Sequence, residues 1–524
     1  MNLPNAERPF LNAVRCIADI PRYHARHTPD AVALRFGDRQ TTYRELDDFS
    51  NRVANGLIAH GVGPGDRVAV LDKNCDSFFE IYFGATKAGA VLVPINYRLV
   101  AAEMAFVIND ARAKIVFVDD SFVPVIAEIH DQLHAVDLIV MTNDSFSSWR
   151  DSQSGKDPGL EGAQDDVCMQ LYTSGTTGLP KGVELTNHNF LSSVPGLLEA
   201  AGNLTSDDTF LVVVPLFHVA GVGSATVTLL AGLKTVIARE FTPAGFLTAV
   251  SRERITVTLL VPAMIKATLA DESIEHADLS SLRIVCYGAS PIAADLLRSA
   301  MDRFRHSGFV QFYGMTETTG AIVALSPQDH KRADSEIMAS CGRGILGVEI
   351  RVVDESGNRC GPRQVGEIVC RTAQNMKGYW KRPADTTAVK KGDWLHTGDV
   401  GYFDESGYLY IRDRLKDVII SGGENIFSAE IESVILRHPG VVDVAVLGVP
   451  DERWGEAVKA LVVLKDDAQA EAADLLRYAR AQLAAYKIPK SIDFVSVLPR
   501  DAAGKILKRE LREKYWQGHE RRIN

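Results

Sequence analysis

The stretch "YTSGTTGLPKG", residues 172–182, combines hydroxyl side chains, glycines and one lysine. It follows the apolar run VCMQLY, a pattern that predicts a strand leading into a tight loop. Hydroxyls, a lysine, and glycines that let backbone N–H groups approach a ligand are the groups that hold phosphate. An ordinary turn has a similar composition, so the stretch alone leaves both interpretations open.

The same residues disfavour a P-loop NTPase. The P-loop signature is G-x-x-x-x-G-K followed by Ser or Thr at the start of a helix. Here Pro180 precedes Lys181, and Gly182 follows it. The sequence therefore predicts a phosphate loop of another kind, if it predicts a ligand at all.

Composition places the chain among globular proteins. The 524 residues predict about two to four structural units. Hydrophobic residues at 46% and charged residues at 24% exclude a disordered or fibrous chain. A net charge of -10 argues against broad contact with nucleic acid. Charges near the N-terminus, the lack of a long apolar run and scattered cysteines without a C-x-x-C pair predict a cytoplasmic protein without a cysteine metal site.

The patterning predicts an α/β fold. Up to about residue 240, helical patterns alternate with short apolar runs, which is typical of βαβ units. Short alternating strands after about residue 340 predict a small antiparallel β unit, and the pattern from about residue 415 predicts an α+β unit. We expect a large N-terminal domain with βαβ sheet subdomains and a small antiparallel β unit, followed by a small α+β C-terminal domain.

The opening stretch closely resembles the signature of the acyl-adenylate-forming superfamily, which contains acyl-CoA synthetases, peptide-synthetase adenylation domains and beetle luciferases. Further motifs that resemble this superfamily follow in order along nearly the whole chain. They are PLFHVAG at 215–221, YGAS at 287–290, QFYGMTET at 311–318, HTGDVGYFDESGYLYIRDRLKDVIISGGENI at 396–426 and PRDAAGKILK at 499–508. The chain is most similar to bacterial fatty-acyl-CoA synthetases and somewhat less similar to plant-type hydroxycinnamate ligases.

The resemblance implies a division of labour along the chain. Residues 1–413 would form an AMP-binding domain with the ATP and acid sites. Residues 414–416, with Lys416, would be a hinge, and residues 417–524 a mobile domain that carries the catalytic lysine, Lys505. Ser428 departs from the family, because relatives usually have proline there, and we expect it to stiffen its loop less.

The resemblance also implies the residues of each site. Lys505 would bridge the substrate carboxylate and the α-phosphate, and Glu317 would bind Mg²⁺. His218, at the end of an apolar run expected to be a strand, would orient or gate the acid, although a histidine there is often structural. The catalytic set is Lys505, Thr173, Glu317 and His218; the ATP set is Thr173, Ser174, Gly175, Thr176, Thr177, Gly178, Lys181, Gly288, Ala289, Ser290, Tyr313, Gly314, Thr316, Asp399 and Arg414; the acyl pocket is His218, Val219, Gly221 and Val222; the CoA channel includes Gly422 and Gly423.

The function implied is that of an ATP-dependent acyl-CoA synthetase with Mg²⁺ as cofactor and ATP and CoA as co-substrates. It would convert a hydrophobic acid, of the medium- or long-chain fatty acid class, to acyl-AMP and then to acyl-CoA. An aryl- or hydroxycinnamate-type CoA ligase and an acyl-AMP ligase that loads a carrier protein stay open. A non-catalytic relative is disfavoured because Lys505 and Glu317 are retained. A homodimer and weak peripheral contact with a membrane also stay open.

Overall fold

The computed structural model describes residues 8–173, 180–332, 335–422, 424–465, 468, 470–500 and 506–517. Two compact units make up the chain: Met1–Glu349 with Arg371–Leu395, and Ile350–Cys370 with His396–Asn524. In the described ranges, no helix has the length and apolar character needed to cross a membrane. The expected hinge at residues 414–416 concerns a movement, and it stays a prediction.

One sheet of the first unit contains the two strands that flank the predicted phosphate loop. Its strand order is β18-β8-β7-β4-β3-β5-β6. The strands β3 to β7 run parallel to one another, whereas β8 is antiparallel to both β7 and β18. Thr173 pairs with Lys181, so the two ends of the loop are held side by side. The bounds are β3 Arg67–Leu71, β4 Val91–Pro94, β5 Ala113–Val118, β6 Leu138–Met141, β7 Val167–Thr173, β8 Lys181–Thr186 and β18 Gly378–Tyr379.

The other sheet of this unit has the order β15-β14-β13-β12-β11-β9-β10-β1-β2. Its centre, from β1 to β13, is parallel, and its edges are antiparallel. Parallel strands place their carboxyl ends at one edge, where α/β folds bind ligands. The bounds are β1 Val32–Phe36, β2 Arg39–Thr42, β9 Thr209–Val212, β10 Lys234–Ile237, β11 Val257–Leu260, β12 Ile284–Gly288, β13 Gly308–Met315, β14 Gly320–Leu325 and β15 Arg343–Gly344.

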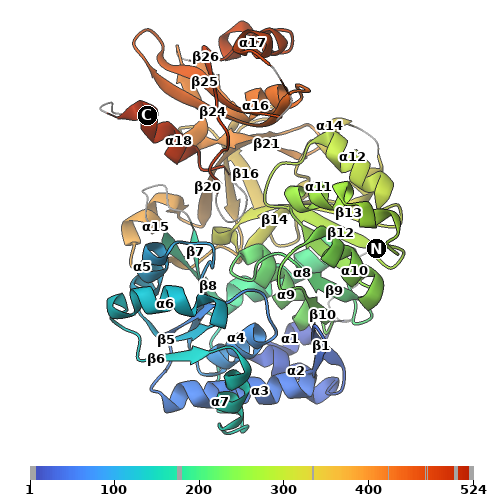
Figure 1. The fold of residues 1–524 in the computed structure, drawn as a ribbon, viewed down its shortest axis with the longest axis vertical. Helices are drawn as coiled ribbons and strands as arrows, with labels where there is room; N and C mark the ends of the chain where they lie inside the picture. The colour runs from blue at the N-terminus through green and yellow to red at the C-terminus, as the bar shows by residue number, and fades with distance from the viewer. Residues whose placement is uncertain are drawn as a thin grey trace. The chain divides into compact units, whose positions relative to one another are not determined.

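Helices cover these sheets through apolar faces. Figure 1 shows α10, α11 and α12 close together beside the nine-stranded sheet, and buried Phe246, Ile265 and Leu297 pack there with Leu211 and Val285 of the strands. The helices of this unit are α1 Phe10–Ala13, α2 Asp19–His27, α3 Tyr43–Ala59, α4 Ser77–Lys87, α5 Ala101–Ala111, α6 Val123–Ile129, α7 Asp144–Asp151, α8 Asn187–Ala200, α9 Val219–Leu230, α10 Pro243–Glu253, α11 Pro262–Ala270, α12 Ala294–Arg303, α13 Pro327–Lys331, α14 Ser335–Met338 and α15 Pro383–Val389.

The second unit contains the strands predicted after residue 340. The strands β16, β17 and β20 are neighbours in a small sheet, and β21 pairs antiparallel with β20. The short strand β19 and residues 394–395 of β20, with which it pairs, belong to the first unit. The bounds are β16 Glu349–Val353, β17 Gly366–Arg371, β19 Lys390–Lys391, β20 Trp394–Phe403 and β21 Leu409–Arg414.

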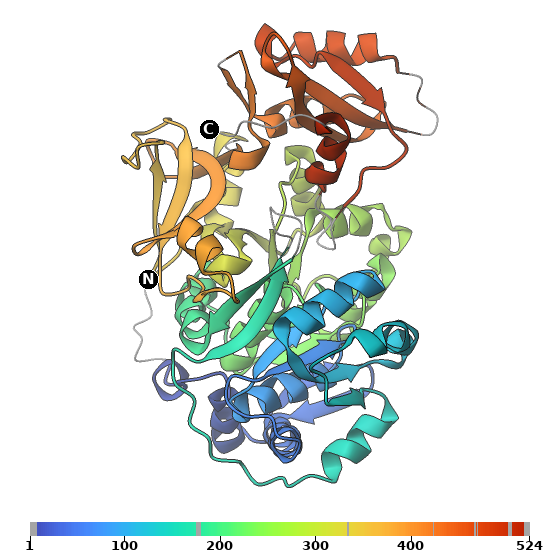
Figure 2. The same cartoon turned by 90° about the vertical axis from the view of Figure 1, so that its left-hand side faces the viewer.

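The last sheet of the second unit has helices on both faces. Its order is β23-β22-β25-β24, and β26 pairs parallel with β25. Because side chains alternate along a strand, Val444 and Val446 pack with residues of α16 and α17, whereas Ala445 and Leu447 pack with Leu511 of α18. Figure 2 shows helices on opposite faces of this sheet. The bounds are β22 Ile419–Ser421, β23 Glu424–Ile426, β24 Val441–Asp451, β25 Gly455–Leu464, β26 Ser491–Phe494, α16 Ser428–Leu436, α17 Ala472–Arg480 and α18 Lys508–Trp516. The predicted α/β fold class is confirmed.

A fully buried lysine joins α4 to α3. The ammonium of Lys87 donates to the Asp47 carboxylate at 2.6 Å, to the Asp47 carbonyl at 3.0 Å and to Asn51 Oδ1 at 2.7 Å. Burial lowers the pKa of Lys87 to about 8, although Asp47 opposes the shift. The contact between the two helices therefore depends on Asp47 to compensate a charge that water does not reach.

We expect Asp47→Ala to destabilise the protein more than Lys87→Met does. Asp47→Ala leaves the buried Lys87 ammonium without its counter-ion, which costs about 3–5 kcal/mol of folding stability. Lys87→Met removes the buried charge itself and fills its space with an apolar side chain of similar shape. Melting temperatures of the two variants and the parent protein measure the difference. A larger loss in Lys87→Met would contradict this account of the ion pair.

Candidate active site

Lys181, the first residue of β8, lies against an aromatic ring and a carboxylate. Its Nζ is 5.2 Å from the centroid of the Tyr379 ring and 3.1 Å from Asp385 Oδ1. Tyr379 reaches this place because β18 pairs with β8, with Gly378 opposite Glu184. The lysine side chain is only 10% exposed, so its charge is held in a defined position.

Glu317 is linked to the same tyrosine. It lies in a short 3₁₀ helix, Thr316–Thr318, directly after β13, and is buried. The Tyr379 hydroxyl donates to Glu317 Oε1 at 2.8 Å. Burial, together with the charge of Glu317, raises the pKa of Tyr379, so its hydroxyl remains a donor. Tyr379 therefore connects the predicted phosphate lysine with the predicted metal ligand, although the sequence had not singled it out.

The predicted adenine residues lie at the ends of the neighbouring parallel strands β12 and β13. Gly288 pairs with Phe312, and a Cβ on Gly288 would be 2.3 Å from the Phe312 carbonyl oxygen. Ala289 has φ +65°, a conformation that non-glycine residues rarely adopt and that is common at ligand sites. Ala289 and Ser290 are exposed, whereas Tyr313 is half-buried. The two strand ends thus present accessible side chains on a closely packed backbone.

Gly314 and Thr316 complete this edge. A Cβ on Gly314 would be 2.0 Å from the Gly320 carbonyl oxygen, so only glycine fits between β13 and β14. Thr316 is half-buried and precedes Glu317 directly. Both therefore lie beside the predicted metal ligand.

His218 does not end a strand, in contrast to the expectation from sequence. The strand β9 ends at Val212, and His218 occupies the N-cap position of α9. Pro215 lies in the same apolar run and cannot donate a backbone hydrogen bond to a strand ladder. The imidazole instead packs against Phe217, with ring centroids 4.5 Å apart.

The other predicted acyl-pocket residues begin α9. Val222 is fully buried, and a Cβ on Gly221 would be 2.2 Å from the Pro215 carbonyl oxygen. Val219 and His218 are half-buried. Of these four residues, His218 and Val219 have the accessible side-chain surface.

Glu317 is suited to Mg²⁺ without further protein carboxylates. Within the described part of the chain, no three His, Cys, Asp or Glu side chains are grouped so that they could hold a metal. At nucleotide sites Mg²⁺ needs only one or two carboxylates, because phosphate and water supply its other ligands. A buried carboxylate oriented by Tyr379 fits that requirement.

In the second unit, the two predicted ribose residues face each other. Asp399 of β20 is opposite Arg414 of β21, with Arg414 Nε 3.4 Å from Asp399 Oδ1. Asp399 is buried, whereas 43% of the Arg414 side chain is exposed. The pair leaves the guanidinium accessible to a ligand.

Glu367 of β17, which sequence reasoning missed, binds the part of β20 that leads to Asp399. Its carboxylate lies 2.7 Å from His396 Nδ1 and accepts the Gly398 N–H at 3.3 Å. Gly398 has φ +70°, which glycine adopts without strain. Glu367 lies 31 positions before Gly398 on another strand, so only the pairing of the strands reveals the contact.

The hinge and CoA-channel predictions also fall in the second unit. Lys416 is half-buried, and burial, together with the nearby charge of Arg414, lowers its pKa. Gly422 has φ +62°, and a Cβ there would be 2.7 Å from the Trp454 ring. Seven predicted residues lie outside the described ranges: Ser174, Gly175, Thr176, Thr177, Gly178, Gly423 and Lys505.

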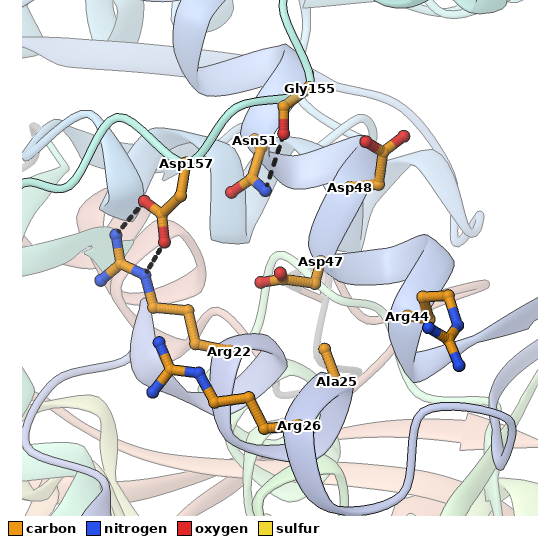
Figure 3. Close-up of a pocket in the computed structure, with 9 residues that line it drawn as sticks. All are labelled: Arg22, Ala25, Arg26, Arg44, Asp47, Asp48, Asn51, Gly155 and Asp157. Carbon is orange, nitrogen blue, oxygen red and sulfur yellow. Dashed lines mark hydrogen bonds and ion pairs between the residues drawn. The ribbon is translucent and has the colours of Figure 1, made fainter.

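A cavity of about 350 Å³ is lined by none of the predicted site residues. Figure 3 shows the side chains that line it. Residues of α2, α3 and the segment 155–157 line it. Arg22 binds both carboxylate oxygens of Asp157, at 2.7 and 2.8 Å, and Asn51 donates to the Gly155 carbonyl at 3.1 Å. These bonds connect surface elements to one another, and we do not assign the reaction to this cavity.

Comparison with known proteins identifies the group to which these residues belong. AMP-binding enzymes match residues 22–380, and the C-terminal domain of AMP-binding enzymes matches residues 430–505. The chain is 39% identical to the fatty acid–[acyl-carrier-protein] ligase ScoC of Streptomyces coeruleorubidus, covering 96% of this chain and 97% of ScoC. It is 40% identical to a feruloyl-CoA synthase of an Amycolatopsis species, covering 94% and 98%. The structure of o-succinylbenzoate CoA synthetase from Bacillus subtilis with its acyl-adenylate intermediate has a TM-score of 0.85 at 32% identity, covering 94% and 97%.

We expect Tyr379→Phe to raise the Mg²⁺ concentration needed for half-maximal ATP turnover by about tenfold, because Glu317 loses the hydrogen bond that orients it. Phenylalanine keeps the ring against Lys181, so the change isolates the hydroxyl. Glu317→Gln should give a larger rise, since it removes the charge itself. Mg²⁺ titrations of pyrophosphate release measure both, and an unchanged requirement in both variants would place the metal elsewhere.

Proposed function

The chain belongs to the family of AMP-binding enzymes, and from that premise we propose that it joins a medium- or long-chain fatty acid to coenzyme A. The acid carboxylate attacks the α-phosphorus of ATP, and pyrophosphate leaves. The thiol of CoA then attacks the carbonyl of the acyl-adenylate, and AMP leaves. One acid, one ATP and one CoA thus give acyl-CoA, AMP and pyrophosphate.

The arrangement of Lys181, Tyr379 and Glu317 is the observation that carries this proposal. An anionic acid must approach an anionic triphosphate, so the site needs a fixed cation and a fixed metal ligand. The ring of Tyr379 lies against Lys181, and its hydroxyl binds Glu317. Lys181 would bind the β- and γ-phosphates, and Glu317 would hold Mg²⁺, which would neutralise charge on the departing pyrophosphate.

Other residues would position the rest of the nucleotide. Tyr313 and the strand end at Ala289 would border the adenine, and Thr316 would donate to the α-phosphate. Asp399 would accept hydrogen bonds from the ribose hydroxyls, and Lys505 would bridge the acid and the α-phosphate. We propose that residues 417–524 turn about Lys416 between the half-reactions, so that Lys505 serves only the first.

The apolar start of α9 favours a hydrophobic acid, because Val219 and Val222 have no polar group for a second carboxylate. CoA is the proposed acceptor because the stretch SGGENIFSAEIE, residues 421–432, resembles acyl-CoA synthetases. The cytoplasm, which supplies ATP and CoA, is the proposed location. The similarity to ScoC favours a second candidate, transfer of the acyl group to a carrier protein.

We expect pyrophosphate release with fatty acids of about 8 to 16 carbons, and AMP release that continues only when CoA is added, since an adenylate held in the site blocks turnover. The test is a panel of fatty, hydroxycinnamic and dicarboxylic acids assayed with CoA, with acyl-carrier protein and with neither thiol. A preference for feruloyl-type acids would show that the substrate is a hydroxycinnamic acid and not a fatty acid. Turnover with the carrier protein and not with CoA would show that the carrier protein is the acyl acceptor.

We expect Lys505→Ala to slow adenylation by about a thousandfold or more while a supplied acyl-adenylate still reacts with CoA, because a cation that bridges two reacting anions acts in one step only. Pyrophosphate exchange and thioester formation from synthetic acyl-adenylate measure the two steps separately. Equal losses in adenylation and in thioester formation would contradict the proposal that Lys505 serves only the first half-reaction.

A further inference from the structure

Ser428 begins α16 and is completely buried in the second unit. Its neighbour in space is Asp413 of β21, the residue before Arg414. A serine side chain without exposed surface must find its hydrogen-bond partners inside the protein. The hydrogen-bond partners of Ser428 therefore indicate its role.

Ser428 makes three hydrogen bonds. Its N–H donates to Asp413 Oδ2 at 2.5 Å, and its hydroxyl donates to the same oxygen at 2.7 Å. The ammonium of Lys508 donates to the Ser428 hydroxyl oxygen at 2.7 Å. Because the hydroxyl both donates and accepts, its orientation is fixed between an anion and a cation.

Lys508 is the first residue of α18, and it is bound at two points. Besides Ser428, its ammonium contacts Glu432 Oε1 at 2.7 Å, one turn further along α16. Burial alone would lower the pKa of Lys508, but Glu432, Asp413 and Asp417 outweigh it and raise the pKa above its usual value. Lys508 is therefore charged, and Ser428 and Glu432 together hold its ammonium in place.

Contacts on either side of residues 501–505 are also described. Arg500 and Ile506 form an antiparallel bridge, and the Leu507 N–H donates to the Pro499 carbonyl at 2.8 Å. Lys508 comes directly after Leu507, and Lys505 precedes it by three positions in the sequence. The contact of Lys508 with Ser428 thus lies at the C-terminal end of the stretch that supplies the proposed catalytic lysine.

A proline at position 428 would have neither an N–H nor a hydroxyl. It would fit the first turn of α16 but could make none of the three bonds. The sequence had suggested only a less stiff loop here, whereas the structure places a helix start with a connecting hydroxyl. Ser428 therefore makes hydrogen bonds at this position that a proline could not make.

We propose that Ser428 is a positioning residue for the adenylation step, because it connects Lys508, which follows Lys505 by three positions in the sequence, to Asp413 beside the proposed hinge. This inference rests on the proposed function of Lys505. Ser428 touches neither substrate nor nucleotide in this account. It acts through Lys508.

The test compares Ser428→Ala, which keeps the N–H but loses the hydroxyl, with Ser428→Thr, which keeps both. Ser491→Ala is the matched control, because Ser491 also accepts a hydrogen bond from a lysine, Lys459 at 3.2 Å, and lies near an aspartate, Asp493, that the same lysine binds. Pyrophosphate exchange and thioester formation from synthetic acyl-adenylate are measured for each variant, along with the melting temperature.

We expect Ser428→Ala to lower kcat for adenylation by about tenfold with little change in the KM for ATP, and to leave thioester formation within about twofold, because the lost hydroxyl binds Lys508 and Asp413 and not the nucleotide. Ser428→Thr should restore adenylation to within about threefold of the parent, since its hydroxyl can replace the missing bond. Ser491→Ala should leave both half-reactions at the parent level.

Equal losses of both half-reactions in Ser428→Ala, a failure of that variant to fold, or unchanged adenylation would overturn the proposal and make Ser428 a residue of the fold alone. Failure of Ser428→Thr to recover at an unchanged melting temperature would overturn it as well. Lys505→Ala, assayed in parallel, separates the positioning role of Ser428 from the catalytic role of Lys505. If that variant keeps adenylation, the proposed role of Lys505 is wrong, whereas a loss there without a loss in Ser428→Ala rejects only the positioning role.

Discussion

The antiparallel ladder between β7 and β8 is the constraint on which the candidate site of the first unit depends. It fixes Lys181 opposite Thr173, and the far edge of β8 receives β18. Tyr379 is in place only because β18 pairs there, and the Trp380 N–H also donates to the Gly182 carbonyl at 2.7 Å. A residue almost two hundred positions along the chain is thereby brought against the lysine.

The sequence predicted those parts of the site that lie within continuous motifs. The strand before the phosphate loop, the small antiparallel unit and the strands β12 and β13 with the loops that follow them were predicted from apolar periodicity interrupted by polar residues and glycine. The contacts of Tyr379 and Glu367 could not be predicted in this way. Each binds a residue of another strand, and such a contact depends on which strands are neighbours, which local patterning does not specify.

The apolar run before His218 shows a different limit. Eight residues from Phe210 to Phe217 have the composition of a buried strand, yet the strand stops at Val212. The rest forms a buried connection in which Asn74 takes over the role of a neighbouring strand: the Leu216 N–H donates to its Oδ1 at 2.9 Å, and its Nδ2 donates to the Val214 carbonyl at 3.1 Å. Burial and strand structure give the same signal in sequence, and only the partners of the backbone distinguish them.

The close approach of Gly221 to Pro215 has a practical consequence for redesign. Libraries that alter the chain-length preference of such ligases would naturally vary the small residues at the start of α9. At Gly221 any side chain would clash with the Pro215 backbone. Substitutions there would therefore displace α9 and destabilise the protein without changing its specificity. Diversity placed at Val219, whose side chain has accessible surface, would leave the scaffold intact.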